Sequence, residues 1–447
     1  MWTDGRYYLQ AEKQLEQGWT MMKMEADQPT WFGWVKDNLN EANSVGLDFT
    51  QYPAYMLEER FKDIKAKGIT LVSTPNLVDI VWGEKRPARP VNKVFHVETK
   101  YTGLSTKEKL QKIFDKLGSG VDLMLVTSLD EIAWLLNLRG TDIAYNPVFF
   151  SYAILHPDHK IDLFIDSSKV SGAAKEYIES INVTLSDYDS IEKHLSVLAE
   201  NGKKIGVDNK KCNSMLHAII KPVAVEKNGV IEELKALKTE TEREGMRRCN
   251  IKDCAAIMKY FAFLEQELKN PDHNLDEFTG ARKVEEFRTH GELYQGPSFD
   301  TISSIGPNGA VIHYKPEKET ALKLNNNEIY LLDSGGQYLE GTTDITRTAH
   351  FGGNPPTAFQ KEAYTRVLMG VIDLERIVWP SDTTISGADM DILARKALWE
   401  VGLDYKHGTG HGVGTFLNVH EGPQGISRAN RTKLIEGMCV SDEPGYY

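Results

Sequence analysis

The alternation of hydrophobic and polar positions predicts a first unit over the first 93 residues. It mixes short apolar runs, such as Ile69–Val72, with helical stretches such as Tyr55–Lys67. It ends at the proline-rich segment 86–90, and because proline interrupts regular backbone hydrogen bonding, we interpret this segment as a linker. The pattern predicts an incomplete amino-terminal α/β domain.

The next unit alternates between helical and strand patterns. Ser105 and Glu108 have the spacing of a capping box, and apolar residues recur behind them at helical intervals. The apolar run 121–126 predicts a buried strand, and the runs 149–155 and 161–165 predict a hairpin around a polar turn. A second α/β domain follows from this pattern.

The remainder of the chain opens on the stretch 232–270, whose Glu, Lys, Arg, Ala and Leu content predicts one long helix. A second helix is predicted over 275–289. Later elements are predicted as strands at 301–305, 310–314, 328–333 and 342–351 and as helices at 357–378 and 385–401. Helices, then strands, then helices indicate an α+β fold. The predicted domains cover residues 1–93, 94–236 and 237–447.

Charge and cysteine usage narrow the function classes. The formal net charge of -12 disfavours binding to nucleic acid or to an acidic membrane surface, because both are negatively charged. No run of about 18 apolar residues is present, so a membrane span is not expected. The four cysteines show no C-x-x-C spacing, which favours a reducing compartment, and we expect a cytoplasmic location.

Two acidic residues stand at positions typical of a metal site. Asp333 ends an apolar strand just before a pair of glycines, and Asp344 lies in a threonine-rich strand pattern on one face with Thr342, Thr346 and Thr348. Two adjacent strands would bring both carboxylates together. Taken alone, Asp333 is equally explained as a turn cap, and Asp344 as part of a solvated sheet face.

Three histidines gather in a glycine-rich segment further on: His407, His411 and His420. The many glycines exclude a stable helix, so the spacing of His407 and His411 is not the helical pair of H-E-x-x-H peptidases. Glycine permits close approach of the backbone to a ligand, while imidazole binds metals and exchanges protons near neutral pH. We interpret the cluster as functional.

Near the end of the sequence, Glu443 precedes a Pro-Gly turn. By itself this signal is weak, but its combination with Asp333, Asp344 and a histidine gives oxygen donors and one imidazole. Such a donor set suits manganese, zinc or cobalt.

These segments, in this order, resemble the metallopeptidase family with the pita-bread fold, and within it the X-prolyl aminopeptidases (aminopeptidase P). Further segments that resemble it are Met1–Tyr7, Leu129–Leu135, Asn146–Tyr152 and Pro307–Ala310. The resemblance spans nearly the whole chain. It implies two creatinase-like amino-terminal α/β domains, followed by a pita-bread catalytic domain that is truncated at its carboxy-terminal end, in a cytoplasmic homodimer.

The resemblance also implies two divalent metal ions, most simply Mn²⁺, with Zn²⁺ or Co²⁺ as alternatives. Asp333 would be a bidentate ligand, Asp344 a bridge, His411 a ligand of the second metal and Glu443 the first glutamate. A fifth ligand, a bridging Glu in a following strand, would lie beyond Tyr447, and without it the chain is expected to be inactive.

The implied reaction is release of the amino-terminal residue from peptides with proline at the second position, by attack of a metal-bridging hydroxide. His313, His407 and His420 would bind substrate and stabilise or protonate the tetrahedral intermediate. Arg139 is expected to reach over the site, from its own subunit or from a partner subunit.

Three alternatives stay open. A prolidase would cut only X-Pro dipeptides, and a metal-free pita-bread protein would serve as a binding module. A fragment with unpaired sheet edges would be poorly soluble or marginally stable.

Overall fold

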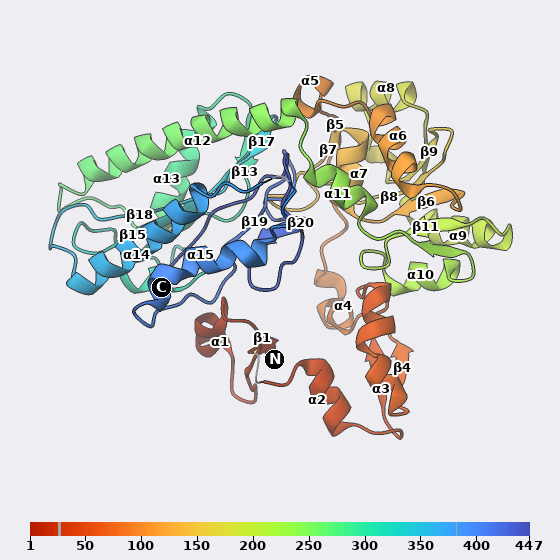
Figure 1. The fold of residues 1–447 in the computed structure, drawn as a ribbon, viewed down its shortest axis with the longest axis horizontal. Coiled ribbons are helices and arrows are strands. Elements are labelled where there is room, and N and C mark those ends of the chain that lie inside the picture. The colour runs from red at the N-terminus through yellow and green to blue at the C-terminus, as the bar shows by residue number, and fades with distance from the viewer. Residues whose placement is uncertain (26–27, 381) are drawn as a thin grey trace.

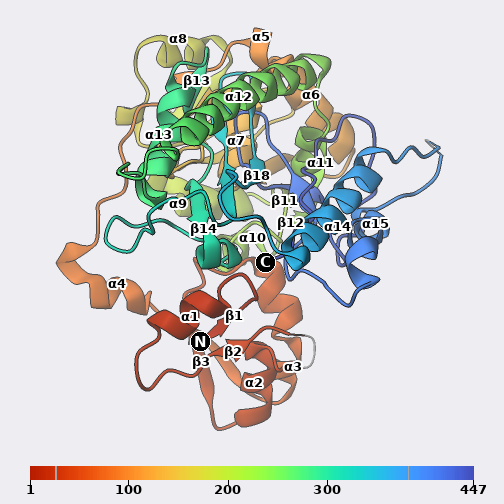
Figure 2. The same cartoon turned by 90° about the vertical axis from the view of Figure 1, so that its left-hand side faces the viewer.

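The computed structural model describes residues 1–25, 28–380 and 382–447. Figures 1 and 2 show three parts: a small part in red, a second in orange to yellow-green, and a third in green to blue that begins with the long helix α12 (Glu240–Glu267). In the described residues, no helix is both long enough and apolar enough to cross a membrane.

The first part is built of short elements around a small core. β1 pairs with β2 and β3 with β4, both in parallel, and Phe61 is fully buried between them and the helices. Its elements are β1 (Trp2–Thr3), α1 (Tyr8–Gln14), β2 (Met22–Lys23), α2 (Trp31–Asn38), β3 (Ser44–Leu47), η1 (Met56–Arg60), α3 (Lys62–Ala66), β4 (Thr70–Ser73), α4 (Leu77–Trp82) and η2 (Gly83–Lys85).

The second part is a mixed six-stranded sheet with helices on both faces. Its strand order is β10-β9-β8-β6-β11-β12, in which β8 is antiparallel to both of its neighbours. The elements are β5 (Phe95–His96), α5 (Thr99–Thr102), α6 (Thr106–Leu117), β6 (Leu123–Val126), α7 (Leu129–Leu136), β7 (Leu138–Arg139), β8 (Tyr152–Leu155), β9 (Ile161–Phe164), η3 (Ser167–Lys169), α8 (Gly172–Ser180), β10 (Val183–Ser186), η4 (Tyr188–Ser190), α9 (Ile191–Glu200), β11 (Ile205–Val207), α10 (Ser214–Ile220), β12 (Ala224–Glu226) and α11 (Val230–Ala236).

Local signals in this part were predicted correctly. Ser105 and Glu108 form the expected capping box at the start of α6, and β8 and β9 form the expected hairpin. Two apolar clusters cover the two faces of the sheet, because the central strand β6 is buried on both sides.

The described residues of the third part form three small sheets, β13-β16-β17, β14-β15-β18 and β19-β20. α12 and α13 cover the sheet β14-β15-β18, while α14 and α15 pack against β20. The remaining elements are α13 (Glu277–Thr289), β13 (Tyr294–Pro297), β14 (Ile302–Ile305), η5 (Gly306–Ala310), β15 (Tyr330–Ser334), β16 (Gly336–Tyr338), β17 (Gly341–Thr342), β18 (Ile345–Ala349), α14 (Ala358–Glu375), α15 (Gly387–Trp399), β19 (Gly410–Gly412) and β20 (Glu421–Ile426).

The prediction of one long helix over 232–270 was wrong. The helix is divided into α11 and α12, because Leu237 is extended and Thr239 begins a new helix through a capping box with Glu242. The break has a second cause: Lys238 lies in the interval and its ammonium group is buried against Glu421.

Two strand predictions in the third part also need correction. Residues 310–314 form no strand: Pro307 starts the 3₁₀ turn η5, and the N–H groups of Val311 and Tyr314 then bond within successive turns. The predicted strand 342–351 is two strands, since Thr343 bonds to Gly336 and the chain crosses there from the sheet of β16 to the sheet of β15.

Candidate metal centre

Asp333 lies on β15, the central strand of its sheet, opposite Ile302 on one side and Thr346 on the other. Its Oδ1 atom is buried and has no hydrogen-bond partner in the described residues. Burial, and next the negative charge of Asp344, raises the pKa of Asp333 to about 8. Two carboxylates in one buried place repel each other unless a cation lies between them.

Asp344 lies where the chain passes from β17 to β18, at the crossing between the two sheets. Asp333 and Asp344 therefore lie near each other, as expected. The continuous strand predicted over 342–351, from which this proximity was expected, does not form. Between the two aspartates, the segment 337–341 contributes to the hairpin of β16 and β17.

His411 lies on β19 and faces both acidic segments. Its Nδ1 bonds to the carbonyl of Gly412 at 2.8 Å, while its Nε2 lies 3.1 Å from Asp344 Oδ2 and 2.9 Å from Glu443 Oε1. Burial opposes protonation, but the contacts with Asp344 and Glu443 raise the pKa of His411 to about 10. The nitrogen and the two oxygens thus surround a place that favours positive charge.

Glu443 is delivered by an extended segment that runs beside β19. Its N–H donates to Thr409 at 2.7 Å, and Ser441 N–H donates to the carbonyl of His411 at 2.8 Å. A Cβ atom at Gly410 would lie 2.2 Å from the carbonyl oxygen of Ser441, so only glycine permits this approach. Glu443 Oε1 is buried, and the Nε2 of His411 lies 2.9 Å from it.

His420 also enters this group. Its ring centroid lies 4.1 Å from that of His411, and ligand atoms of Asp344, His411 and His420 all lie within 4.8 Å of one another. Sequence reasoning gave His420 a substrate-binding role alone, but the geometry places it within reach of a metal as well. Burial, and next the charge of His411, lowers the pKa of His420.

The donor chemistry fits divalent metal ions. The unpartnered Oδ1 of Asp333, the carboxylate of Glu443 and the Nε2 of His411 supply hard oxygen donors and one imidazole donor at this centre. Such a set is of the kind bound by manganese, zinc or cobalt. The four residues expected to be ligands are therefore brought together.

The other two predicted histidines lie beside this centre. His407 Nδ1 contacts the carbonyl of Gly408 at 2.7 Å, and its Nε2 is buried without a partner in the described chain. Burial lowers the pKa of His407, while its hydrogen bond to Gly408 and the charge of Glu443 oppose this shift. His313 Nδ1 contacts the hydroxyl of Tyr7, a residue that sequence reasoning did not assign to the site.

The second part of the chain holds the segment between His411 and His420. Leu417 is 1% exposed and belongs to the core of that part. Arg139 does not reach over the site; it is buried and donates to the carbonyls of Phe416 at 2.5 Å and Thr415 at 3.2 Å. The guanidinium group of Arg139 has five N–H donors, so it can bond several carbonyls at once and hold this backbone segment in place.

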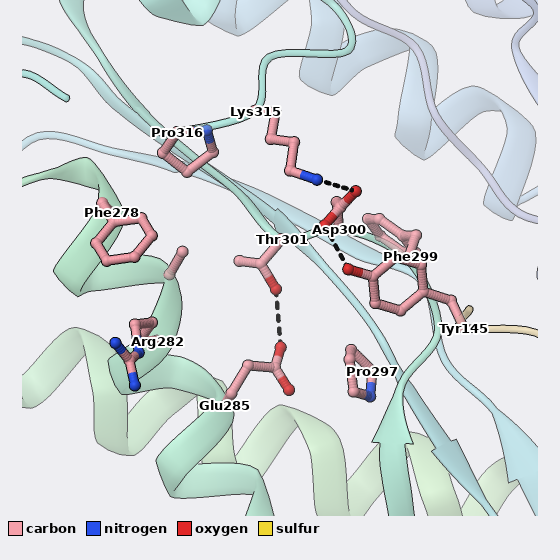
Figure 3. A pocket seen from close by; sticks show the side chains of 11 residues that line it. Tyr145, Phe278, Arg282, Glu285, Pro297, Phe299, Asp300, Thr301, Lys315 and Pro316 are labelled. Carbon is pink, nitrogen blue, oxygen red and sulfur yellow. Dashed lines mark hydrogen bonds and ion pairs between the residues drawn. The ribbon is translucent and has the colours of Figure 1, made fainter. Parts of the chain in front are cut away.

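A separate cavity of about 220 Å³ lies between α13 and the start of β14 (Figure 3). Asp300 lies at its edge, where it pairs with Lys315 at 3.0 Å and accepts a hydrogen bond from Tyr145 of the second part. The described residues that line the cavity include none of the seven predicted site residues.

Comparison with known proteins relates both larger parts to described families. Residues 85–242 match the creatinase/prolidase N-terminal domain, and residues 244–447 match metallopeptidase family M24. A probable Xaa-Pro aminopeptidase P of Laccaria bicolor is 46% identical over 458 residues, which cover 100% of this chain and 70% of that protein. Its counterpart in Sordaria macrospora is 46% identical over 100% of this chain and 74% of its own length.

Solved structures agree. The X-prolyl aminopeptidase of Caenorhabditis elegans, described as a cytosolic enzyme with a di-nuclear active site, has a TM-score of 0.93 and 36% identity over 100% of this chain and 73% of its own. An Xaa-Pro dipeptidase of Bacillus anthracis has a TM-score of 0.61 at 22% identity over 77% of this chain and 91% of its own, a likeness of fold alone. The predicted fold class and family are confirmed; the three domain boundaries stay a prediction.

Proposed function

The chain belongs to metallopeptidase family M24, and from this premise we propose how it acts as a metal-dependent aminopeptidase on peptides with proline at the second position. The observation that carries the proposal is the convergence of Asp344, His411 and Glu443, with Asp333 buried beside them. We assign these four residues as the ligands of two divalent metal ions.

When bound, two divalent ions lower the pKa of water and polarise a carbonyl group, which is the chemistry that peptide hydrolysis needs. The role of the protein is to hold its donors in place. His411 is oriented by its contact with Gly412, and Glu443 by its bond to Thr409. Because these partners belong to the backbone, the donors keep their directions without support from flexible side chains.

Histidines 313, 407 and 420 supply the remaining chemistry in this proposal. Burial lowers the pKa of each ring, so each is neutral near pH 7. His407 uses its single N–H, on Nδ1, to donate to the carbonyl of Gly408, so its Nε2 can accept a hydrogen bond from the substrate, whereas His313 and His420 can each donate one N–H to it. A donor directed at the scissile carbonyl gains strength as negative charge develops on the oxygen. We assign all three to substrate binding and to stabilisation of the tetrahedral intermediate.

We further propose manganese as the native metal, a cytoplasmic location and a homodimer. Oxygen-rich donors favour manganese over softer metals. All four cysteines are free thiols, which supports a reducing compartment. Helix α14 exposes Phe359, Tyr364 and Leu368, apolar surface that supports association of two subunits.

The test is hydrolysis of an Arg-Pro-Pro tripeptide beside an X-Pro dipeptide with added Mn²⁺, together with measurement of bound metal, in this chain and in a form extended beyond Tyr447 through the expected fifth ligand. Cleavage of the tripeptide supports the aminopeptidase, whereas cleavage of the dipeptide alone would indicate a prolidase. A protein that binds no metal and cleaves neither peptide would indicate a binding module.

A further inference from the structure

The segment Asp4–Tyr7 of the first part forms a tight turn against the third part. Arg6 Nε and Nη2 each donate to the carboxylate of Asp4 at 2.8 Å, and Tyr7 N–H donates to the carbonyl of Asp4 at 3.0 Å. A Cβ atom at Gly5 would lie 3.2 Å from Cβ of Lys406, next to His407. The turn therefore contacts the histidine-bearing segment directly.

Tyr7 extends from this turn to His313, which is 306 positions away in the sequence. The hydroxyl oxygen lies 2.8 Å from Nδ1 of His313. The two rings meet edge to face, with centroids 5.2 Å apart and planes at 77°. One hydrogen bond and one ring contact together fix both the position and the rotation of the imidazole.

The direction of this hydrogen bond follows from the two groups. A neutral imidazole has one N–H and one unprotonated nitrogen, and the latter is a strong acceptor. A phenol O–H is a good donor, and within the described residues Nδ1 of His313 is the polar atom that the Tyr7 hydroxyl contacts. The hydroxyl therefore donates to Nδ1, and the ring proton is left on Nε2.

We propose that Tyr7 is a positioning residue that holds His313 in the tautomer protonated at Nε2, so that Nε2–H is directed to the substrate. The inference rests on the proposed role of His313 in the peptidase reaction. The first part of the chain then contributes to catalysis through the imidazole that it orients, in addition to narrowing access to the site.

The first experiment reads the tautomer itself, independent of turnover. Chain labelled with ¹⁵N-histidine is examined by long-range ¹⁵N–¹H correlation, and the His313 signals are identified as those lost in His313→Gln. We expect an unprotonated Nδ1 and a protonated Nε2. In Tyr7→Phe, which keeps the ring but removes the hydroxyl, the two tautomers should mix and the two nitrogen shifts should approach each other.

The matched control is Tyr8→Phe. Tyr8 is the next residue, and its ring faces Lys23, whose Nζ lies 4.9 Å from the ring centroid. This variant should leave the His313 signals unchanged. A protonated Nδ1 in the unmodified chain, or identical His313 signals in Tyr7→Phe, would overturn the proposal.

The second experiment uses the metal-loaded enzyme in a form extended beyond Tyr447 through the expected fifth ligand, with an X-Pro tripeptide as substrate. Because the bond acts on a donor that is used most strongly in the transition state, Tyr7→Phe should lower kcat by about three- to tenfold, with KM changed by less than about twofold. A raised KM with unchanged kcat would mean that Tyr7 only docks the first part, and would refute the positioning role. Absence of turnover in every form would contradict the peptidase function, while the tautomer result would still decide the role of Tyr7.

Discussion

Lys235 and Glu421 form an ion pair across the boundary between the second and third parts, with both side chains at most 2% exposed. Lys238 pairs with the other carboxylate oxygen of Glu421, and Asp130 lies 3.0 Å from Lys235. Glu421 directly follows His420 in the sequence. The position of this site histidine is therefore fixed by charges from two parts of the chain.

Removing the carboxylate of Glu421 should destabilise the protein strongly. Glu421→Gln leaves two buried ammonium groups with one remaining partner, a change that costs about 3–5 kcal/mol. The measurement is urea unfolding followed by tryptophan fluorescence. Glu58→Gln is the control: its partner Lys221 is 67% exposed, so its cost should be below about 1 kcal/mol. Equal effects of the two substitutions would contradict the importance of burial at Glu421.

Leu417→Ala should lower both stability and activity. The side chain fills a place in the core of the second part, and its loss should cost about 2–5 kcal/mol. Because Leu417 lies between His411 and His420, we also expect a lower kcat. Leu77→Ala makes the same change at a residue that is 68% exposed, and it should alter neither the unfolding midpoint nor the rate. A stable, fully active Leu417→Ala protein would refute this account.

Stability should depend on acid pH through Asp162. Burial opposes ionisation, but hydrogen bonds from His156 and Lys160 lower the pKa of Asp162 to about 2, from 3.8 in the unfolded chain. A lowered folded pKa stabilises the protein above the unfolded value, and the gain is lost as the pH falls through the folded value.

Asp162→Asn should therefore cost about 2 kcal/mol at pH 7, and its difference from the unmodified protein should shrink between about pH 4 and pH 2. Thermal unfolding across this range measures it, with the exposed Asp115→Asn as control. A difference that stays constant with pH would show that the carboxylate charge is not responsible.

Metal binding should fail when a ligand is removed. Asp333→Asn is expected to weaken Mn²⁺ binding by about tenfold or more, measured by calorimetry on protein first stripped with a chelator. Asp300→Asn, beside the separate cavity of Figure 3, should bind Mn²⁺ normally. Normal binding by Asp333→Asn would remove Asp333 from the ligand set.

The parts of the fold that were predictable from sequence depend on local interactions. The capping box of Ser105 and Glu108 acts within one helical turn. The position of Asp333 near the end of a strand follows from the five consecutive residues of β15. The glycine-rich segment around His411 was correctly excluded from helix for the same local reason.

The errors came from hydrogen bonds and ion pairs that the pattern of apolar and polar positions does not encode. The interval between α11 and α12 is fixed partly by Glu421, and the break in the predicted strand 342–351 by Gly336. The pairing of Tyr7 with His313 joins residues 306 positions apart, and no periodicity records it. The segment Met1–Tyr7, which contains Tyr7, was recognised in the sequence as resembling the family, but nothing in it predicted the contact with His313.

Leu417 also bears on how this enzyme can be divided. It is supplied by the third part but completes the apolar interior of the second. A cut between residues 236 and 237 would leave a gap in the core of one piece and an exposed leucine in the other, in the loop that leads from β19 to His420. In a chimaera of two related enzymes joined at this point, the side chain at residue 417 would have to fit the core of the second part. We therefore expect the two parts to be inherited, and to vary, as a single unit.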